Sequence, residues 1–369
     1  MHPQAAHAGA ILTVDLNALR SNYRLLREQA GSAFCGAAVK ADAYGLGAER
    51  VGPALAAEGC RHFFVAHLDE GIALRPHLPA TAQVFVLHGP PVGTEQEFIA
   101  HGLTPVLNSL QQIQGWHALA QSLQRPLPAI IQVDSGMSRM GLPAAEADAW
   151  LANPHYLQSI PPLFLMSHLA CAEHQGHPMN ESQLARFKTL RQRLPQVPAS
   201  LANSSGIFLG RDYQFDLVRP GAALYGIAPV AGAANPLQPV VALHGRILQT
   251  RTIERGDHVG YGISYSATAQ RQIATVGVGY ADGWLRSMSN RGVVFVDDKA
   301  VPMVGTVSMD SITIDVTGIA AERLQAGALV ELIGPHRPVD EVAKLAGTIG
   351  YEILTGLGQR YYREYIGNL

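Results

Sequence analysis

The sequence lacks the features that mark membrane-spanning, secreted and nucleic-acid-binding proteins. No uninterrupted apolar run reaches the roughly 18 residues that suggest a membrane span. No run of lysine and arginine is present and the formal net charge is only −2, so neither nucleic acid nor a membrane is expected as a partner. Residues 1–10 have neither the basic start nor the long apolar segment of a secretion signal.

Cysteine is scarce as well. Only Cys35, Cys60 and Cys171 are present, an odd number with no CxxC pair among them. Cysteines in this pattern usually serve as small core residues in proteins of a reducing compartment, which favours a cytoplasmic location. Charged residues make up 15% of the chain and apolar residues 47%, as in a compact globular protein.

The chain has 369 residues, more than one hydrophobic core usually serves, so two domains are expected. Apolar runs alternate with segments of helical spacing between Phe34 and Gly221. This alternation indicates a parallel sheet covered by helices, and eight runs predict an α/β fold, a closed (β/α)8 TIM-type barrel. The runs are FCGAAVK, HFFVAHL, QVFVLHG, TPVLNS, AIIQVDS, LFLMSHLA, ASLANSS and FDLVRPG.

An open, doubly wound sheet is the alternative, but that fold usually has fewer strands. The glycine-rich stretch GVGYADG, near Gly279, does not support it, because it lies outside the alternation and lacks GxGxxG spacing.

A second pattern follows a small, Pro-rich segment near residue 235. Short β-branched stretches broken by Gly, Asp and Pro predict a mainly antiparallel β domain. We therefore expect the barrel over residues 1–235 and the β domain over residues 236–369. About the first 12 residues, which include part of the strand-like ILTVDL, are expected to pair with the β domain.

Polar residues follow the ends of five predicted barrel strands. The carboxyl ends of barrel strands meet on one face, so these side chains are expected to gather there as a site. Solvated strand ends without a function are the alternative interpretation. The residues are Lys40, Arg139, His168, Asn203, Ser204 and Arg219.

These residue types match the needs of pyridoxal 5′-phosphate. A partly desolvated lysine amine has a lowered pKa and forms a Schiff base with an aldehyde. Glycines and a serine near the last two strand ends offer N–H and hydroxyl donors to a phosphate, and Arg219 is placed to face a pyridine nitrogen. The pattern therefore indicates a pyridoxal-phosphate enzyme.

Longer stretches resemble the alanine racemase family, which consists of fold-type III pyridoxal-phosphate enzymes. The resemblance covers nearly the whole chain and implies interconversion of L- and D-alanine, either to supply D-alanine for peptidoglycan or to break it down. It also implies a homodimer in which each β domain completes the other subunit's pocket. The matching stretches, in the family's order, are AAVKADAYGLG, VDSGMSRMG, SHLACAE, ANSSG, VRPGAALYG, VGYGISY, GYADGW, VGTVSMD and TIGYE.

The resemblance implies roles for individual residues. Lys40 is implied to hold the cofactor and to act as one of two bases at the substrate's Cα, with Tyr261 as the other. His168 and Arg219 are implied to be the cationic neighbours that favour the Tyr261 phenolate, and Arg219 to keep the ring nitrogen unprotonated.

Further residues are implied to bind the cofactor or the substrate. The implied cofactor contacts are Lys40, Tyr44, His168, Asn203, Ser204, Arg219, Gly221, Ala222 and Tyr351, the last also closing the pocket. The implied substrate contacts are Arg139 and Met309, and the implied entrance residues are Glu173, Tyr280 and Arg286. No metal is expected, because the histidines in HLACAEHQGH lack the helical HExxH frame.

Two positions depart from the family's pattern. Gln132 stands where many relatives have a carbamylated lysine that orients the substrate-binding arginine, so Arg139 is expected to be less firmly held. Ser200 stands where some relatives have histidine, so weaker or water-mediated support of Arg219 is expected.

Three alternative functions remain open at this point. One is a racemase for serine or lysine, or with a broader substrate range. Another is a basic amino-acid decarboxylase, which typically needs a catalytic cysteine and a Gly-rich phosphate loop that are not found here. The third is a non-catalytic pyridoxal-phosphate carrier, which the presence of a β domain with Tyr261 and Met309 disfavours.

Overall fold

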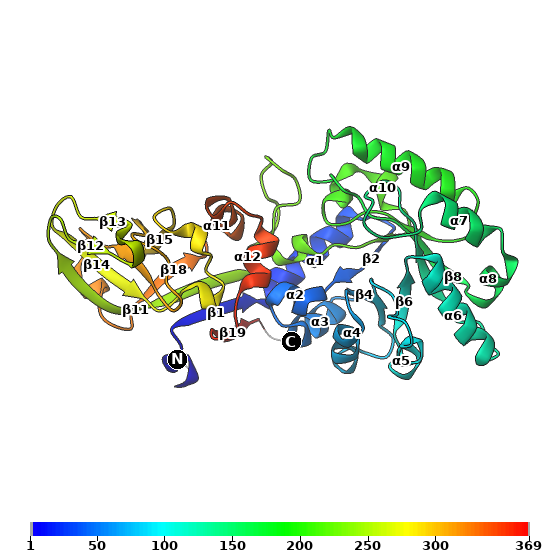
Figure 1. The fold of residues 1–369 in the computed structure, drawn as a ribbon, viewed down its shortest axis with the longest axis horizontal. Helices are drawn as coiled ribbons and strands as arrows, with labels where there is room; N and C mark the ends of the chain where they lie inside the picture. Colours follow the sequence, from blue (N-terminus) through cyan, green and yellow to red (C-terminus); the bar gives the residue numbers. More distant parts are fainter. Residues whose placement is uncertain (1–2, 368–369) are drawn as a thin grey trace. The chain divides into compact units, whose positions relative to one another are not determined.

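The computed structural model describes residues 3–367 and divides into two compact units. The barrel unit comprises Leu19–Leu224 and Ala228–Leu237. The β unit comprises the residues up to Ala18, the short segment Tyr225–Ile227 and the residues from Gln238 onward. Figure 1 shows the helix-rich barrel unit in blue to green and the strand-rich β unit mainly in yellow to orange.

The barrel unit is built from parallel strands that pair in chain order. β10 pairs with β2, and β10 is joined to the β9 segment by hydrogen bonds from Asp216 N–H to Ala199 O (3.0 Å) and from Arg219 N–H to Ala202 O (2.9 Å). Because β2 and β3 are two halves of one strand, the eight apolar runs form a closed barrel, as predicted. The strands are β2 (Phe34–Cys35), β3 (Ala37–Ala38), β4 (His62–Val65), β5 (Gln83–Val86), β6 (Thr104–Leu107), β7 (Ala129–Gln132), β8 (Pro162–Met166), β9 (Ala199–Ser200) and β10 (Leu217–Val218).

Helices alternate with these strands. In α6, the Ser109 side chain accepts the Gln112 N–H (3.2 Å) and so caps the first turn, while Ile113, Trp116 and Ala120 are buried at helical spacing. The α-helices are α1 (Leu16–Gln29), α2 (Lys40–Gly45), α3 (Ala48–Ala57), α4 (Leu68–Leu74), α5 (Glu95–Ala100), α6 (Leu110–Ser122), α7 (Ala144–Leu151), α8 (Pro154–Ser159), α9 (Pro178–Arg191) and α10 (Arg211–Gln214).

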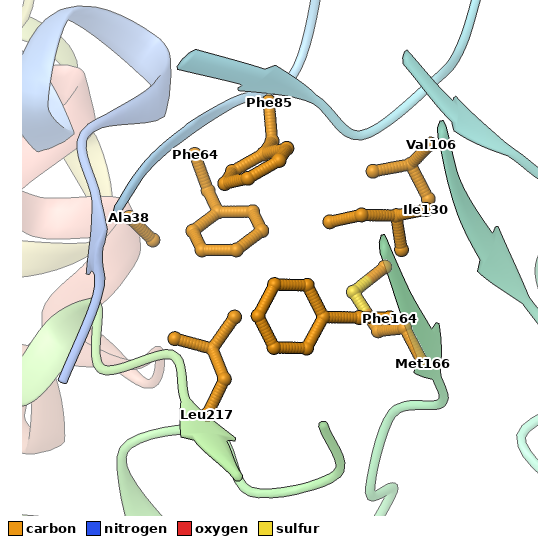
Figure 2. Packing of buried hydrophobic residues seen from close by; sticks show 8 residues of the cluster. All are labelled: Ala38, Phe64, Phe85, Val106, Ile130, Phe164, Met166 and Leu217. Atoms are coloured by element: carbon orange, nitrogen blue, oxygen red, sulfur yellow. The ribbon is translucent and has the colours of Figure 1, made fainter. Parts of the chain in front are cut away.

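The barrel interior is filled by apolar side chains (Figure 2). The rings of Phe64 and Phe85 stack with their centroids 5.0 Å apart. Each fully buried aromatic side chain stabilises the fold by about 1.5–3 kcal/mol, so the barrel has a packed core rather than a pore. The residues are Ala38, Phe64, Phe85, Val106, Ile130, Phe164, Met166 and Leu217.

The β unit contains a mainly antiparallel sheet, as predicted. β1 lies between β11, with which it pairs antiparallel, and β19, with which it pairs parallel. The strands are β1 (Ala10–Asp15), β11 (Val241–Ile253), β12 (His258–Val259), β13 (Tyr265–Ser266), β14 (Arg271–Val276), β15 (Val293–Val296), β16 (Lys299–Pro302), β17 (Ile312–Asp315), β18 (Leu329–Ile333) and β19 (Tyr362–Ile366). Two α-helices, α11 (Val339–Ala346) and α12 (Gly350–Gly356), precede β19.

Short 3-10 helices connect many of these elements. They are η1 (Pro3–His7), η2 (Arg75–His77), η3 (Ser205–Leu209), η4 (Ala222–Tyr225), η5 (Tyr261–Ile263), η6 (Tyr280–Asp282), η7 (Arg286–Met288) and η8 (Ala321–Arg323). Across residues 3–367, no helix has both the length and the apolar character needed to cross a membrane.

Candidate active site

Lys40 follows the first barrel strand and begins a strained turn. The four residues after it, Ala41–Tyr44, all have φ between 53° and 56°, so α2 winds in the left-handed sense. Residues other than glycine lose about 1–2 kcal/mol each in this conformation. The surrounding structure holds the turn: Ala41 N–H donates to Glu70 Oε1 (2.5 Å) and Ala48 N–H donates to Asp42 Oδ1 (2.7 Å). Strain of this kind persists where neighbouring contacts enforce it, often at functional sites.

The surroundings of Lys40 favour its neutral amine. Burial lowers the pKa of Lys40, and the charge of Arg139 lowers it further, while the carboxylate of Glu70 acts in the opposite direction. A larger fraction of the side chain is therefore nucleophilic at neutral pH than for an exposed lysine.

Arg219 is buried at the end of β10 and donates several hydrogen bonds. Its Nη2 donates to Ser167 O (2.7 Å) and to Leu201 O (3.4 Å), and its Nη1 donates to the Ser200 hydroxyl. Burial lowers the pKa of Arg219 to about 9, which leaves it protonated at neutral pH. The expectation of water-mediated support is wrong, because the Ser200 hydroxyl reaches the guanidinium directly and donates in turn to Leu217 O (2.6 Å), whereas weaker support than from histidine stays a prediction.

His168 lies beside Arg219, with Nδ1 3.4 Å from Nη2. Burial, followed by the charges of Arg219, Arg139 and Lys40, lowers the pKa of His168 to about 3. The imidazole is therefore neutral at physiological pH and accepts from the guanidinium through Nδ1. The prediction of a cationic pair is wrong for His168, because burial, and then the charges nearby, make a positive imidazole costly.

Ser204 forms the centre of a small cradle of backbone donors. Its Oγ accepts the N–H groups of Gly221 (2.9 Å) and Ala223 (3.2 Å). A Cβ on Gly221 would lie 2.4 Å from the Tyr44 hydroxyl, so only glycine allows this close approach. Because Ser204 Oγ accepts two N–H groups, its O–H is oriented to donate elsewhere, and a hydroxyl donor next to a glycine suits a phosphate, so the residues present fit that group.

Two neighbouring residues extend this cradle. Ala223 directs its N–H to Ser204, while the phosphate contact of the Ala222 N–H stays a prediction. Asn203, which was predicted to contact the cofactor, accepts the Gly206 N–H through Oδ1 (2.9 Å) and so shapes the loop beside the cradle.

Arg139 and Gln132 are placed near one another in sequence but are not joined. Within residues 3–367, neither side chain makes a hydrogen bond or ion pair, although Gln132 is buried at the end of β7. The positive charge of Arg139 is close enough to lower the pKa values of Lys40, His88 and His168. Arg139 is thus a cation with no acidic partner in the described chain.

The β unit presents its predicted site residues at its surface, with Tyr261 at the start of η5 and Met309 in a loop. Tyr261 is 74% exposed and Met309 is 53% exposed. The segments that carry them touch, because Thr306 Oγ1 donates to Tyr261 O (2.9 Å). Tyr351 lies on α12 and is 37% exposed. Among the described residues of the β unit, none covers most of the Tyr261 or Met309 side chain.

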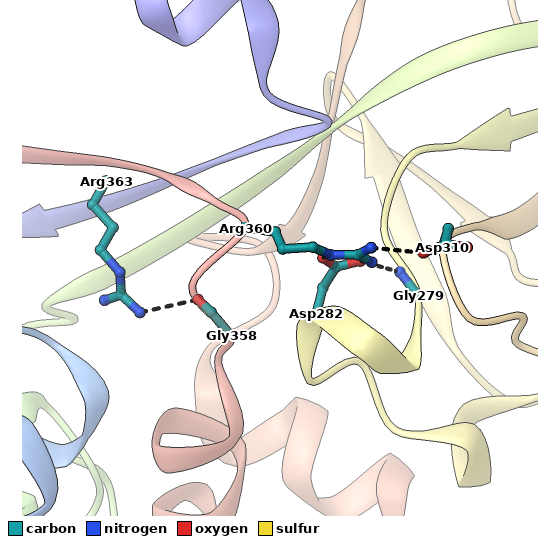
Figure 3. A network of polar contacts seen from close by, with 6 residues as sticks. All are labelled: Gly279, Asp282, Asp310, Gly358, Arg360 and Arg363. Carbon is teal, nitrogen blue, oxygen red and sulfur yellow. Dashed lines mark hydrogen bonds and ion pairs between the residues drawn. The ribbon is translucent and has the colours of Figure 1, made fainter.

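An ion-pair network between the half-exposed Arg360 and the buried Asp282 braces the Met309 loop (Figure 3). Arg360 donates to both oxygens of Asp282 (2.6 and 2.9 Å) and to Asp310 Oδ1 (2.7 Å). Asp282 also accepts the Gly279 N–H (2.8 Å), and Ala281 N–H donates to Met309 O (3.0 Å). The turn that carries Tyr280 and the loop that carries Met309 are therefore held together.

Sequence reasoning missed Glu70, Ser167, Ala223 and Arg360. Glu70 has one local signal, since it stands three residues after the helix-capping His67. That signal does not reveal its contact with the turn after Lys40, and the other three residues carry no signal in their local sequence.

The comparisons with known proteins agree over nearly the whole chain. Family profiles described as alanine racemase N-terminal domain and C-terminal domain match residues 14–229 and 240–365. A catabolic alanine racemase of Mesorhizobium japonicum is 51% identical over 98% of this chain and 94% of its own. An alanine racemase of Brucella abortus is 50% identical over 97% and 94%. The crystal structure of alanine racemase from Bartonella henselae with covalently bound pyridoxal phosphate covers 97% of this chain and 100% of its own, with a TM-score of 0.94 and 44% identity. The chain therefore belongs to the alanine racemase family.

Proposed function

We propose that this protein interconverts L- and D-alanine with pyridoxal 5′-phosphate as its cofactor. The observation that carries the proposal is the gathering, in one barrel unit, of a lysine with a lowered pKa, a buried arginine and a cradle of phosphate donors. The relatives named as alanine racemases and the pyridoxal-phosphate-bound neighbour support the same activity.

The residues of the barrel unit would hold the cofactor. Lys40 would bind it covalently, while Tyr44, Ser204 and the backbone of Gly221 and Ala222 would hold the phosphate. Bound pyridoxal phosphate supplies an electron sink that makes the Cα proton of an amino acid acidic.

Arg219 controls the strength of that electron sink. Its guanidinium is protonated at neutral pH, so it would donate a hydrogen bond to the pyridine nitrogen and its positive charge would disfavour a proton there. Arg219 would thereby keep the ring a weak electron sink, which favours return of the proton to Cα over its addition elsewhere. This restraint favours racemisation over transamination.

Racemisation needs one base on each face of Cα. The Lys40 amine takes or returns the proton on one face, and Tyr261 does so on the other. A tyrosine oxygen accepts a proton only as phenolate, which a nearby cation favours. Arg219 would supply that charge, with His168 beside it as a partner whose lowered pKa favours the neutral form.

A homodimer accounts for the exposure of Tyr261 and Met309. Together with Ile263, which is 60% exposed, they form an apolar surface on adjacent loops of the β unit. Such a surface needs a cover, and a second copy whose barrel unit binds it would complete both sites. Tyr351 stays a predicted phosphate contact.

Arg139 is suited to bind the substrate carboxylate. It has no acidic partner in the described residues, and its charge is close enough to lower the pKa of Lys40. We retain a broader racemase, one that also accepts serine or lysine, as the second candidate. A cytoplasmic location is consistent with the three free cysteines, and the catabolic relative favours D-alanine breakdown alongside D-alanine supply as a cellular role.

The test is conversion of L-alanine by the purified protein, followed by chiral analysis. We expect D-alanine to accumulate until the two enantiomers are equal, with slower conversion of L-serine and L-lysine. Borohydride reduction followed by peptide mass spectrometry should place the cofactor on Lys40. No conversion, or a cofactor on Lys188, Lys299 or Lys344, would overturn the assignment.

A further inference from the structure

Glu70 joins two segments that are far apart in sequence. One carboxylate oxygen, Oε2, accepts the N–H groups of Ala66 (2.7 Å) and His67 (2.9 Å). The other oxygen, Oε1, accepts the N–H of Ala41 (2.5 Å), the residue that follows Lys40. Three backbone donors thus converge on one partly buried carboxylate.

Only part of this arrangement is ordinary helix capping. Glu70 is the third residue of α4, where a glutamate commonly accepts the N–H of the capping residue, here His67. That role uses Oε2. The bond from Ala41 to Oε1 has no part in capping α4, and it lies at the start of the left-handed turn Ala41–Tyr44.

The turn needs such a clamp. Alanine favours the right-handed helix more than any other residue does, yet Ala41 and Ala43 are held in the left-handed region. Without tertiary contacts the segment would relax, and Lys40, which precedes it directly, would change direction. We propose that Glu70 is a positioning residue for Lys40: it clamps the start of the strained turn and supplies the negative charge that offsets Arg139. This inference rests on the proposed function, in which Lys40 carries the cofactor and moves a proton.

Two charged side chains shift the pKa of Lys40 in opposite directions. In the barrel unit, Arg139 lowers the pKa of Lys40 and Glu70 raises it, while Lys40 itself acts on His88 and His168, whose pKa values are lowered mainly by burial. Removing the Glu70 charge therefore lowers the pKa of Lys40 further. The Lys40 nitrogen then holds a proton taken from Cα less well.

The Glu70→Gln variant keeps the capping of α4 and removes the contact with the turn after Lys40. Glutamine at this position still completes a capping box through its carbonyl. Its amide N–H2 group would face the Ala41 N–H, so the bond to the turn and the negative charge are lost together. Asp69→Asn is the matched control, because it removes one charge from the same helical turn and keeps an oxygen for the Glu70 N–H, which Asp69 Oδ1 accepts at 3.1 Å.

Two measurements on the full-length protein with its cofactor test the proposal. The first is amide hydrogen exchange at Ala41, which should be about tenfold faster in Glu70→Gln, with the barrel strands unchanged. The second is the pH profile of kcat/KM for L-alanine, in which the ionisation of the Lys40 nitrogen should move to lower pH by about one unit. Asp69→Asn should match the wild type in both.

The Glu70→Asp variant keeps the negative charge but shortens the side chain that carries it. Its shorter side chain keeps the charge but cannot reach both segments, so Ala41 exchange should rise while the pH profile stays near that of the wild type. If Glu70→Gln behaves like Asp69→Asn in both measurements, the proposal is wrong. If the wild type does not racemise alanine, the proposed function fails, while exchange at Ala41 still decides whether Glu70 clamps the turn.

Discussion

The two units of this protein present their site residues in opposite ways. In the barrel unit, Arg219 and Ser204 are each 6% exposed and bound by several hydrogen bonds. In the β unit, Tyr261 and Met309 are 74% and 53% exposed on loops. The barrel groups are therefore oriented before any ligand arrives, which is how fixed dipoles and charges stabilise a reacting centre most. The β unit instead offers reactive groups that need a covering surface.

Loss of Lys40 should have the largest effect. Lys40→Ala removes both the covalent anchor and one of the two bases, so we expect kcat/KM for L-alanine to fall by about 10³-fold or more. Lys188→Ala is the control, since Lys188 lies at the surface and pairs with Asp212. Activity of Lys40→Ala within tenfold of the wild type would show that the barrel unit does not supply the essential lysine.

Tyr261→Phe tests the contribution of the β unit. We expect a loss of about 10²–10⁴-fold, the usual contribution of a general base. Since each base serves one face of Cα, solvent-deuterium exchange into L- and D-alanine should be affected unequally. Tyr265→Phe is a neighbouring control, because Tyr265 packs against the Ile253 and Val259 cluster. Equal exchange from both enantiomers at wild-type rates would remove Tyr261 from the mechanism.

Hybrid dimers test whether the barrel unit and the β unit of one site come from different subunits. If each site takes Lys40 from one subunit and Tyr261 from the other, a dimer of Lys40→Ala with Tyr261→Phe has one intact site and one doubly substituted site. Hybrids isolated with two affinity tags should therefore regain about half of wild-type activity. Hybrids as inactive as the parent variants would contradict a shared site and would mean that each subunit uses its own Tyr261.

The smallest effect is expected at Gln132. A carbamylated lysine there would hold Arg139 through a charge-assisted contact, so Gln132→Lys with bicarbonate should lower KM for alanine by about tenfold. Intact mass measures carbamylation, and Gln132→Met should keep KM within about twofold of the wild type, because the Gln132 side chain makes no hydrogen bond in the described residues. A wild type that responds to bicarbonate, or a carbamylated variant with unchanged KM, would show that Arg139 is already held well.

The barrel and the location of its polar groups follow from local sequence. Continuous apolar runs of strand length suit a sheet buried on both faces, and the chain direction of parallel strands brings Lys40, His168 and Arg219 to one end. The β-branched stretches after residue 235 likewise predict the β domain. These features depend on residue type and spacing alone.

The backbone conformation, hydrogen bonds and pKa values of those groups depend on the tertiary structure. The left-handed turn after Lys40 opposes the preference of its alanines and is held by Glu70, 29 residues away along the chain. The neutral state of His168 depends on burial among Lys40, Arg139 and Arg219, three charges from separate strand ends. Hydrogen bonds and pKa values depend on distances in space, and only the closed barrel brings these groups within range of one another.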